Sequence, residues 1–536
     1  MKTPAFCLIA LAMSVSAFSQ TSPPAAPTLT AGAQFKGLRF DWTPVAGASW
    51  YQFERRTHQN DPFVQQGDDL PATTTSTRFT FPLYFFDWTY ARYRVAACNS
   101  AGCTRSAEVS VSNLRRDAVG YFKAAQPVSG AMFGNATDLS PDGQNMVVSS
   151  GETTGGTPQT QEGGAVYVFG KDSNGKWVQR VRFQKDVVSS PEEPMAFDVG
   201  ISASGHTVAV AMGNTQVPNS GGQEGQVDIH HIVNGVWTVT RLPRLPVQTF
   251  GTSLALDESG FYLAVGLGDP NNSVAIYKSI NNVWTHVRDL SLTSQGYQEH
   301  CDGAQLSRDA RVILERCHEE ASAARPARDY LRVYSGSNWT ARTDIDLRFP
   351  TSDTTTYFYR GLGMDRRGDT IAVQYSQNSQ GSLTGTGAVR VYKRASGAYS
   401  LVTTLTPGSW RNSSWKFSYG DSVSVSGDGL TIAVGDWKDN GTGYGPRAAP
   451  LVSGTVPTGA VYVYHYTDAW RLYNMVKPNY YPSDQFLIQN FGDRTLLNGD
   501  GRTMIVPVVD ENSAAKGIDG NWANEDMPYS GAVFLY

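Results

Sequence analysis

The stretch 250–277, FGTSLALDESGFYLAVGLGDPNNSVAIY, contains the unit from which most of this chain is built. It begins with an apolar run, turns through DESG at 257–260, continues through FYLAVG at 261–266 and, after a polar loop, ends in VAIY at 274–277. Short apolar runs bounded by Gly, Asp and Asn are typical of strands joined by tight turns. The stretch therefore predicts three successive strands of one antiparallel sheet.

The same pattern occurs seven times along the chain. The turn tetrads begin at Ser140, Ser202, Asp257, Ser307, Asp365, Ser426 and Asn498, and the third strands begin near Val166, Val227, Val274, Leu331, Val389, Val461 and Val533. Successive tetrads lie 50 to 72 residues apart (307 − 257 and 498 − 426), which is longer than the roughly 40 to 50 residues of common propeller blades. Seven copies of one unit predict a repeat fold in which neighbouring sheets stack on one another.

A fourth strand completes most copies of the unit. It begins with an aromatic residue after a polar turn, at Trp177, Trp237, Trp284, Trp339, Tyr399 and Trp470. The seventh copy ends at Tyr536 after three strands, whereas VGYFK at 119–123, just ahead of the first copy, supplies an unused strand with Tyr121 as its aromatic residue. Closing the ring removes the unpaired sheet edge that an open ring would leave. We therefore expect an all-β seven-bladed β-propeller over 119–536, closed by strand 119–125.

Residues 21–113 follow a different pattern. Apolar residues alternate at Leu38, Phe40 and Trp42 and again at Tyr93, Val95 and Ala97, with Gly, Pro and Thr clusters between the runs. Such runs predict a small immunoglobulin-like antiparallel β-sandwich. The segment resembles a fibronectin type III domain in its opening prolines, Pro23, Pro24 and Pro27, in Trp42 and in YRVAACNSAGC at 93–103. The resemblance implies that Tyr93 is the corner tyrosine and that the domain is a spacer rather than a ligand-binding module, joined to the repeats by a linker at 114–118.

The repeats resemble FG-GAP repeats, as found in integrin alpha-subunit propellers. The resemblance covers 119–536 and rests on FG at 133–134, 250–251 and 491–492, on AVG at 264–266 and 433–435, and on GAVYV at 164–168 and 459–463. Many integrin-type repeats carry an Asp-rich calcium loop, but even NGDG at 498–501 is flanked by Leu496 and Met504 rather than by carboxylates. Calcium requires more oxygen ligands than such a turn offers, whereas Asp and Gly suit the turn itself. We therefore expect no metal and no cofactor.

The composition and the first residues of the chain limit the classes of protein to which it can belong. The chain has 536 residues and a net charge of −4, without a long Lys/Arg run, so the basic footprint of a nucleic-acid-binding protein is missing. Residues 1–20 combine Lys2, an apolar run from Ala5 to Met13 and small residues before Ser19, which is typical of a secretory signal peptide. No later run approaches the roughly 18 apolar residues of a membrane span. We expect an exported monomer that is secreted, periplasmic or on the cell surface.

Four cysteines follow the leader, Cys98, Cys103, Cys301 and Cys317. Four cysteines allow three pairings, and in an oxidising compartment proximity in sequence favours Cys98 with Cys103 and Cys301 with Cys317. In the register of the repeats, the second pair falls on facing positions of one hairpin. Free buried thiols are the alternative, and zinc is disfavoured because only His300 and His318 flank the second pair.

Ligand-binding residues are expected on the face of the propeller that carries the long connections. These connections are 151–163, 213–225, 318–329, 376–387, 436–458 and 510–530. Within and beside them lie the side chains that we expect to bind a ligand, Trp410, Trp415, Trp437, Tyr444, Arg447, Tyr480, Tyr481 and Trp522. Aromatic side chains combine large apolar area with few rotatable bonds, which suits stacking on sugars or anchoring a protein. Packing over the sheet ends is the alternative for each of them.

Two functions remain open. The first is a non-catalytic exported interaction protein, for example in cell adhesion, whose loop face binds a protein or a glycan. The second is a polysaccharide-active hydrolase or lyase that uses loop carboxylates, for which the candidates are Asp436, Asp439, Asp510, Glu511, Asp519 and Asp526. We prefer the first, because no GxSxG elbow, phosphate-binding loop, dinucleotide fingerprint or HExxH pair occurs in a suitable context. No residue is assigned a catalytic role.

Overall fold

The structure is a computed structural model, and it divides into two compact units. It describes residues 22–85, 88–151, 164–184, 198–212, 225–243, 245, 249–268, 272–291, 299–320, 328–347, 361–376, 387–407, 418–441, 443–446, 448, 457–478, 490–522 and 524–536. The smaller unit is built from the chain up to Ala33, from Leu38–Phe79 and from Asp87–Leu114, and the larger unit from Gln34–Gly37, Thr80–Phe86 and Arg115–Tyr536. The expected signal peptide lies outside the described residues. Among the residues described, no helix reaches the length and hydropathy that a membrane span requires.

The smaller unit consists of two sheets. The first has the order β1-β2-β6, with β1 (Leu29–Gln34), β2 (Gly37–Trp42) and β6 (Ser76–Thr80). The second contains β3 (Trp50–Arg56), β4 (Val64–Gln65), β5 (Leu70–Pro71), β7 (Arg92–Asn99), β8 (Gly102–Arg105) and β9 (Val109–Ser110), followed by the 3-10 helix η1 (Ser112–Leu114). Its order is β4-β3-β7-β8, and β5 and β9 pair with β3 and β7. All pairs of this second sheet are antiparallel.

Aromatic residues on the inner faces hold the two sheets of the smaller unit together. The ring of Phe40 in β2 lies 4.8 Å from that of Phe53 in β3 and 4.5 Å from that of Tyr93 in β7, and all three side chains are buried. Such face-to-face packing is that of a β-sandwich. The ring of Tyr93, the expected corner tyrosine, lies in this core, and among the described residues no backbone group is bonded to its hydroxyl. The hydroxyl of Tyr51 instead accepts the N–H of Val45 at 2.8 Å.

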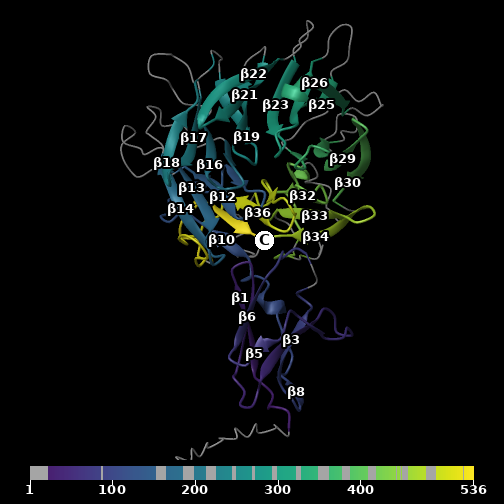
Figure 1. The fold of residues 1–536 in the computed structure, drawn as a ribbon. Helices are drawn as coiled ribbons and strands as arrows, with labels where there is room; N and C mark the ends of the chain where they lie inside the picture. Colours follow the sequence, from purple (N-terminus) through teal and green to yellow (C-terminus); the bar gives the residue numbers. More distant parts are fainter. Residues whose placement is uncertain are drawn as a thin grey trace, which may run out of the picture. The chain divides into compact units, whose positions relative to one another are not determined.

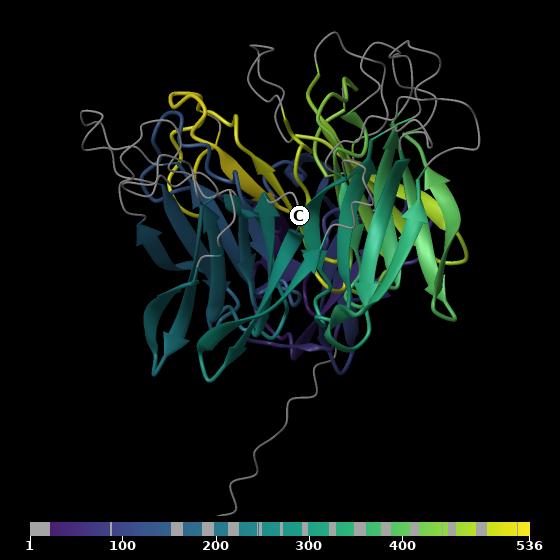
Figure 2. The same cartoon turned by 90° about the horizontal axis from the view of Figure 1, so that it is seen from above.

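The larger unit contains, within the described residues, seven sheets of four antiparallel strands, numbered here sheet 1 to sheet 7. Sheet 1 is β11 (Thr137–Leu139), β12 (Asn145–Ser150), β13 (Ala165–Lys171) and β14 (Trp177–Gln184), and sheet 2 is β15 (Asp198–Ile201), β16 (Thr207–Met212), β17 (Gln226–Val233) and β18 (Val236–Arg241). Sheet 3 is β19 (Thr249–Leu256), β20 (Tyr262–Gly268), β21 (Asn272–Ile280) and β22 (Val283–Ser291), and sheet 4 is β23 (Glu299–Leu306), β24 (Ile313–Glu319), β25 (Arg328–Ser335) and β26 (Ala341–Asp346), with the 3-10 helix η2 (Ser337–Trp339). Sheet 5 is β27 (Leu362–Met364), β28 (Thr370–Ser376), β29 (Gly387–Ala395) and β30 (Ala398–Leu405), and sheet 6 is β31 (Ser422–Val425), β32 (Thr431–Asp436), β33 (Ala460–Tyr466) and β34 (Trp470–Val476). Sheet 7 is β35 (Leu496–Leu497), β36 (Met504–Val508), β37 (Ala532–Leu535) and β10 (Gly120–Phe122). Figure 1 shows the sheets following one another around a ring, and Figure 2 shows their strands from a direction turned by 90°. This arrangement is a β-propeller.

Each predicted tetrad forms the turn between the first and second strands of its sheet. In all seven, the N–H of the fourth residue donates to the carbonyl of the first at 2.8–3.1 Å. The side-chain oxygen of the first residue accepts a further backbone N–H, as Ser140 does from Asn145 and Asp365 from Thr370, both at 2.9 Å. The fourth residue has a positive φ and is Gly in six turns, while Ala310, with φ 57°, occupies this position in sheet 4. The Asp, Ser, Asn and Gly of the tetrads are therefore explained by the turn.

Strand β10 joins the two ends of the ring. Tyr121 pairs with Phe534 in antiparallel register, and their ring centroids lie 5.3 Å apart. The next residue, Phe122, belongs to a buried cluster that also contains Leu535 of sheet 7 and Phe169 of sheet 1. The closing strand thus lies where the unused VGYFK segment predicts it.

A belt of backbone hydrogen bonds links the turns of consecutive sheets. From sheet 2 onward, the backbone N–H of a residue in one turn donates to a backbone carbonyl in the next turn. The pairs, donor first, are Ala203 and Glu258 (2.8 Å), Glu258 and Arg308 (2.8 Å), Asp309 and Arg366 (3.2 Å), Arg366 and Gly427 (3.2 Å), Asp428 and Gly499 (2.9 Å), and Gly499 and Pro141 of sheet 1 (2.6 Å). The step from sheet 1 to sheet 2 lacks a backbone bond because Pro141 has no N–H. The side-chain amide of Asn145 donates to the carbonyl of Ala203 instead, at 3.2 Å. The sheets therefore follow one another around the ring in chain order.

Candidate functional site

The connections between strands are long on one face of the propeller and short on the other. The connection from the second to the third strand comprises residues 437–459 in sheet 6 and 509–531 in sheet 7. The connection from the first to the second strand comprises only residues 426–430 in sheet 6 and 498–503 in sheet 7. The connections from each fourth strand to the next sheet emerge on the same side as the long ones. We call this side the loop face and the side of the tetrads the turn face. Binding residues on a rigid scaffold concentrate in long connections.

A central channel is lined by the innermost strands of all seven sheets. Its cavity of about 330 Å³ is bordered by residues of β11, β15, β19, β23, β27, β31 and β35 and by the second residues of several tetrads. Each innermost strand runs from the loop face toward the turn face, because it ends at its tetrad. A residue at the start of such a strand therefore lies toward the loop face, and a tetrad residue lies at the turn face.

The turn-face end of the channel is crossed by an arginine. Arg308, in the tetrad of sheet 4, reaches Asp138 of β11 in sheet 1, with nitrogen–oxygen distances of 2.6 and 3.2 Å, and also donates to the carbonyl of Leu139 at 3.1 Å. Burial lowers the pKa of Arg308, but its bonds to Asp138 outweigh burial and leave the pKa raised. Because sheets 1 and 4 are three places apart in the ring, this side chain spans the channel.

A second ion pair lies at the same end. Arg366, in the tetrad of sheet 5, donates from Nε to Glu258 in the tetrad of sheet 3 at 2.7 Å. The Glu258 bonds are the main cause of the raised pKa of Arg366. Arg308, Asp138 and Arg366 line the cavity, so their ion pairs narrow the channel at the turn face.

Asp198 lies in the channel toward the loop face. It is the first residue of β15, lines the cavity and is partly exposed. Its two carboxylate oxygens accept the N–H of Val199 at 3.0 Å and that of Leu254 in the next sheet at 2.9 Å. Burial raises the pKa of Asp198 to about 6, although these hydrogen bonds act in the opposite direction. The channel therefore presents a carboxylate that titrates just below neutral pH.

The rim of the loop face carries a fixed tryptophan. Trp437, directly after β32, is half-buried and donates its indole N–H to Asp421 at 2.6 Å, while the ammonium of Lys438 lies 4.4 Å from its ring. Asp421 also accepts the side-chain amide of Gln374 at 2.7 Å. Burial raises the pKa of Asp421, and the nearby charge of Asp493 adds to this. Of the predicted ligand-binding residues that the structure describes, Trp437 is the one held in place on this rim beside acidic groups.

Two other predicted residues contact the arginines of the segment after η1. The guanidinium of Arg115 lies 4.7 Å from the ring of Tyr444, and that of Arg116 lies 5.3 Å from the ring of Trp522. Cation–π contacts of this kind hold aromatic rings in place. These two rings therefore have intramolecular partners, although the Tyr444 side chain remains 48% exposed. The remaining predicted ligand-binding residues, Trp410, Trp415, Arg447, Tyr480 and Tyr481, lie outside the described residues.

The predicted loop carboxylates are largely engaged within the protein. Asp439 is buried in an ion pair with Lys477 and accepts the hydroxyl of Tyr462 at 2.6 Å. Glu511 forms the corresponding ion pair in sheet 7, with Lys123, and accepts the hydroxyl of Tyr121 at 2.9 Å. Lys477 follows β34 as Lys123 follows β10, so the two sheets repeat the same arrangement. Such buried pairs hold connections to sheets rather than presenting free acids.

The other loop carboxylates differ in their surroundings. Asp436 is fully buried and accepts the hydroxyl of Ser418. Asp510 is bonded to the side chain of Asn490, and burial raises the pKa of both Asp510 and Asp519. Asp526 is exposed. None of these contacts pairs two of the carboxylates as an acid and a base.

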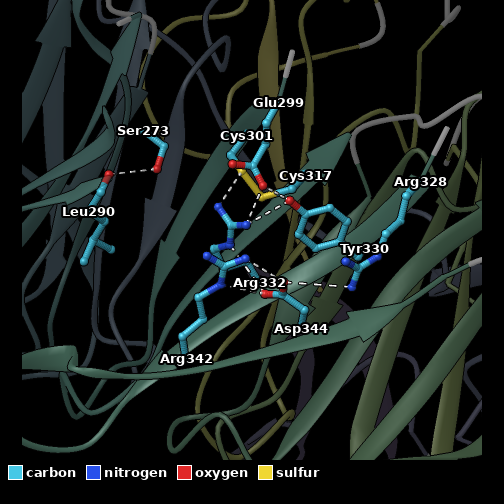
Figure 3. The surroundings of a disulfide bond; sticks show 10 residues. All are labelled: Ser273, Leu290, Glu299, Cys301, Cys317, Arg328, Tyr330, Arg332, Arg342 and Asp344. Carbon is cyan, nitrogen blue, oxygen red and sulfur yellow. Dashed lines mark hydrogen bonds and ion pairs between the residues drawn. A yellow bond between two sulfur atoms is a disulfide. The ribbon is translucent and has the colours of Figure 1, made fainter. Parts of the chain in front are cut away.

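Both expected disulfides are present. Cys98 is joined to Cys103 and Cys301 to Cys317, each pair in direct cross-strand register. Figure 3 shows the second pair beside Arg332, which is fully buried, pairs with Glu299 at 2.5 Å and lies with Nη1 3.6 Å from the sulfur of Cys301. The cysteines and Glu315 form the single group of three potential metal ligands in the described part of the chain. Because the two sulfurs share a bond, this group has no thiolate to offer a metal.

The channel residues were missed by the sequence interpretation, although the aligned tetrads contain a signal for some of them. The second tetrad position holds Pro141, Ala203, Gly427 and Gly499 in four sheets, but Glu258, Arg308 and Arg366 in three consecutive ones. Charged residues at an otherwise small position indicate side chains with partners across the ring. Asp198 has no such signal, since the first strands share no common residue at its position.

Comparisons with known proteins show similar folds at low identity. No family model and no curated protein matches this chain. Solved structures that resemble it include the Dos1 propeller (12% identity, TM-score 0.38, 78% of this chain and 94% of that chain), the complex of KlAtg21 with the coiled coil of AgAtg16 (12%, 0.42, 71% and 95%) and the periplasmic gluconolactonase of Pseudomonas aeruginosa (13%, 0.28, 67% and 97%). At TM-scores below 0.5 these likenesses carry no argument about function.

Proposed function

We propose that this chain is a non-catalytic exported interaction protein whose loop face binds a protein or glycan partner. The observation that carries the proposal is the one-sided design of the propeller. Long connections gather on the loop face, whereas the turn face is closed by tight turns, a hydrogen-bond belt and the ion pairs of Arg308 and Arg366. A scaffold of this kind presents variable segments on one side of a rigid ring.

Trp437 is the residue that we assign to ligand contact with the strongest support. Its indole is positioned by Asp421 and Lys438, so little conformational entropy is lost when a partner packs on it. Half-buried tryptophan beside carboxylates suits a sugar ring with hydroxyl groups or an anchor of a protein partner. The enzyme alternative is weaker, because Asp439 and Glu511 are neutralised by buried lysines.

The finer architecture and the location belong to the same proposal. We assign the seven sheets as the seven blades of an FG-GAP-like propeller over 119–536, and the sandwich at 21–113 as a fibronectin type III-like spacer, with 114–118 as the linker. The aromatic-glycine pairs of the FG motif support the FG-GAP assignment, since Phe133, Phe250 and Phe491 are fully buried and each precedes a glycine with positive φ. Two disulfides and the leader-like residues 1–20 support export, and we expect the protein to act as a monomer.

Binding to a glycan array, followed by a pull-down against extracellular proteins, tests the function. We expect a retained ligand whose affinity falls at least tenfold, roughly 1.4 kcal/mol, in Trp437→Ala. The matched control is Arg311→Ala, because Arg311 has a side chain that is 78% exposed beside the turn-face tetrad of sheet 4. Absence of any glycan or protein ligand, or equal losses in both variants, would contradict a binding role for the loop face.

A further inference from the structure

Asp198 differs from the other charged side chains that line the channel. Asp138 and Arg308 are paired with each other, Arg366 is paired with Glu258, and Asp365 accepts three backbone N–H groups of its own turn. Asp198 accepts two backbone N–H groups, and no described cationic side chain lies within ion-pair distance of it. It is therefore the carboxylate in the channel that remains available to a positively charged ligand.

The groups that surround Asp198 leave its negative charge in place near neutral pH. On the neighbouring inner strands, β11 contributes Asp138, whose charge raises the pKa of Asp198, and β19 contains no charged residue. Arg494 lowers the pKa of Asp198 from a distance but does not line the cavity. The net result is a pKa of about 6, so the carboxylate is ionised at pH 7.5.

The remaining hydrogen-bonding capacity of Asp198 has room for a ligand. A carboxylate has about four lone-pair sites, and backbone groups use two of them here. The cavity of about 330 Å³ is roughly ten times larger than the roughly 30 Å³ that one water occupies. The innermost strands also present free edges, whose carbonyl groups are further acceptors. An ammonium group has three N–H donors and no acceptor, which matches this environment.

We propose that the channel binds an alkylammonium group from the loop face, with its nitrogen at the carboxylate of Asp198. The inference rests on the proposed function and names a chemistry for its ligand. The apolar chain of the ligand would lie between the aliphatic residues of the inner strands, such as Val199 and Leu254, which line the cavity. The group can belong to a small amine or to a lysine side chain of a protein partner, since both carry the same ammonium.

The test is a titration of the full chain with n-butylammonium and, separately, with N-acetyl-lysine-N-methylamide, followed by NMR or calorimetry at pH 7.5. We expect at least one of them to bind and the affinity to fall at least tenfold in Asp198→Asn. Asp142→Asn is the matched control, because Asp142 is an exposed turn-face carboxylate outside the cavity lining, and its variant should bind like the wild type. Near-UV circular dichroism of Asp198→Asn establishes that the variant is folded.

Two further measurements make the result decisive. Lowering the pH from 7.5 to 5 should weaken binding in the wild type, because Asp198 then takes up a proton, and should have little effect in Asp198→Asn. Binding of n-butylammonium would identify a small-amine site, and binding of the lysine derivative alone would identify a protein side chain. If neither amine binds, or if the uncharged n-butanol binds equally well, the ammonium site is refuted. The proposed function still stands in that case if the Trp437→Ala experiment succeeds.

Discussion

At the scale of single residues, glycine stands at the start of the third strand in sheets 2, 5, 6 and 7 because the next sheet leaves no space for a side chain. A Cβ on Gly459 would lie 2.0 Å from the carbonyl oxygen of Phe491, and Gly459 has φ 78°. Gly459→Ala should therefore lower the free energy of unfolding by about 3 kcal/mol, from left-handed strain and overpacking together. Urea unfolding measures this loss. Gly235→Ala provides the control, since Gly235 has φ 81° with nothing near its Cβ and should lose only about 1 kcal/mol. Equal losses would show that crowding contributes nothing.

Asp198 links the candidate site to stability through pH. Burial raises its pKa to about 6 from an ordinary value of 3.8. The charged carboxylate therefore destabilises the folded state above about pH 6, whereas below pH 3.8 the protonated group does not change the stability with pH. As the pH rises from 4 to 7.5, the free energy of unfolding of Asp198→Asn should therefore increase by about 1 to 2 kcal/mol relative to that of the wild type. The partial exposure of the side chain reduces this effect. Urea unfolding at both pH values measures the difference. A stability difference independent of pH would mean that the carboxylate is ordinary in the fold.

At the scale of elements, β10 has only three residues and depends on the ion pair that follows it. Lys123→Ala leaves Glu511 buried without its counter-charge, which should lower the free energy of unfolding by about 3 kcal/mol. Lys477→Ala should cost a similar amount in sheet 6, where the arrangement is the same. In Arg471→Ala the lost ion pair is exposed, so the free energy of unfolding should change far less than in either lysine variant. Thermal unfolding of the three variants provides the comparison, and a small loss in Lys123→Ala would rule out this role for the ion pair.

The elements that the sequence predicts well are those decided by neighbours in the chain. The tetrads are recognisable because Ser140 or Asp365 must bond a backbone group five residues away, and because the fourth position requires positive φ. The cysteine pairs can be predicted as well, because their partners lie only 5 and 16 residues apart in the chain. Arg308 and Asp138 are 170 residues apart, and their pairing depends on the order of sheets around the ring. Nothing in the local sequence of Trp437 identifies Asp421 as its partner either.

At the scale of the whole propeller, closure should make the junction of sheets 7 and 1 as stable as any other. Gly531 of sheet 7 packs against the backbone of Phe133 in sheet 1, as Gly459 of sheet 6 packs against Phe491 in sheet 7. We therefore expect amide hydrogens of β10 and β37 to exchange at rates within about tenfold of those in β20 and β21, because exchange reports local opening. Mass spectrometry of deuterium uptake measures both regions in one experiment.

The same measurement on Lys123→Ala separates closure from general rigidity. Loss of the ion pair weakens the hold on β10, and exchange should then accelerate in β10 and β37 while β20 and β21, on the other side of the ring, change little. If β10 and β37 already exchange fast in the wild type, the terminal strand does not hold the ring closed, and the channel lined by all seven inner strands would open with it. A uniform acceleration over the whole ring would mean instead that the sheets unfold as one cooperative unit.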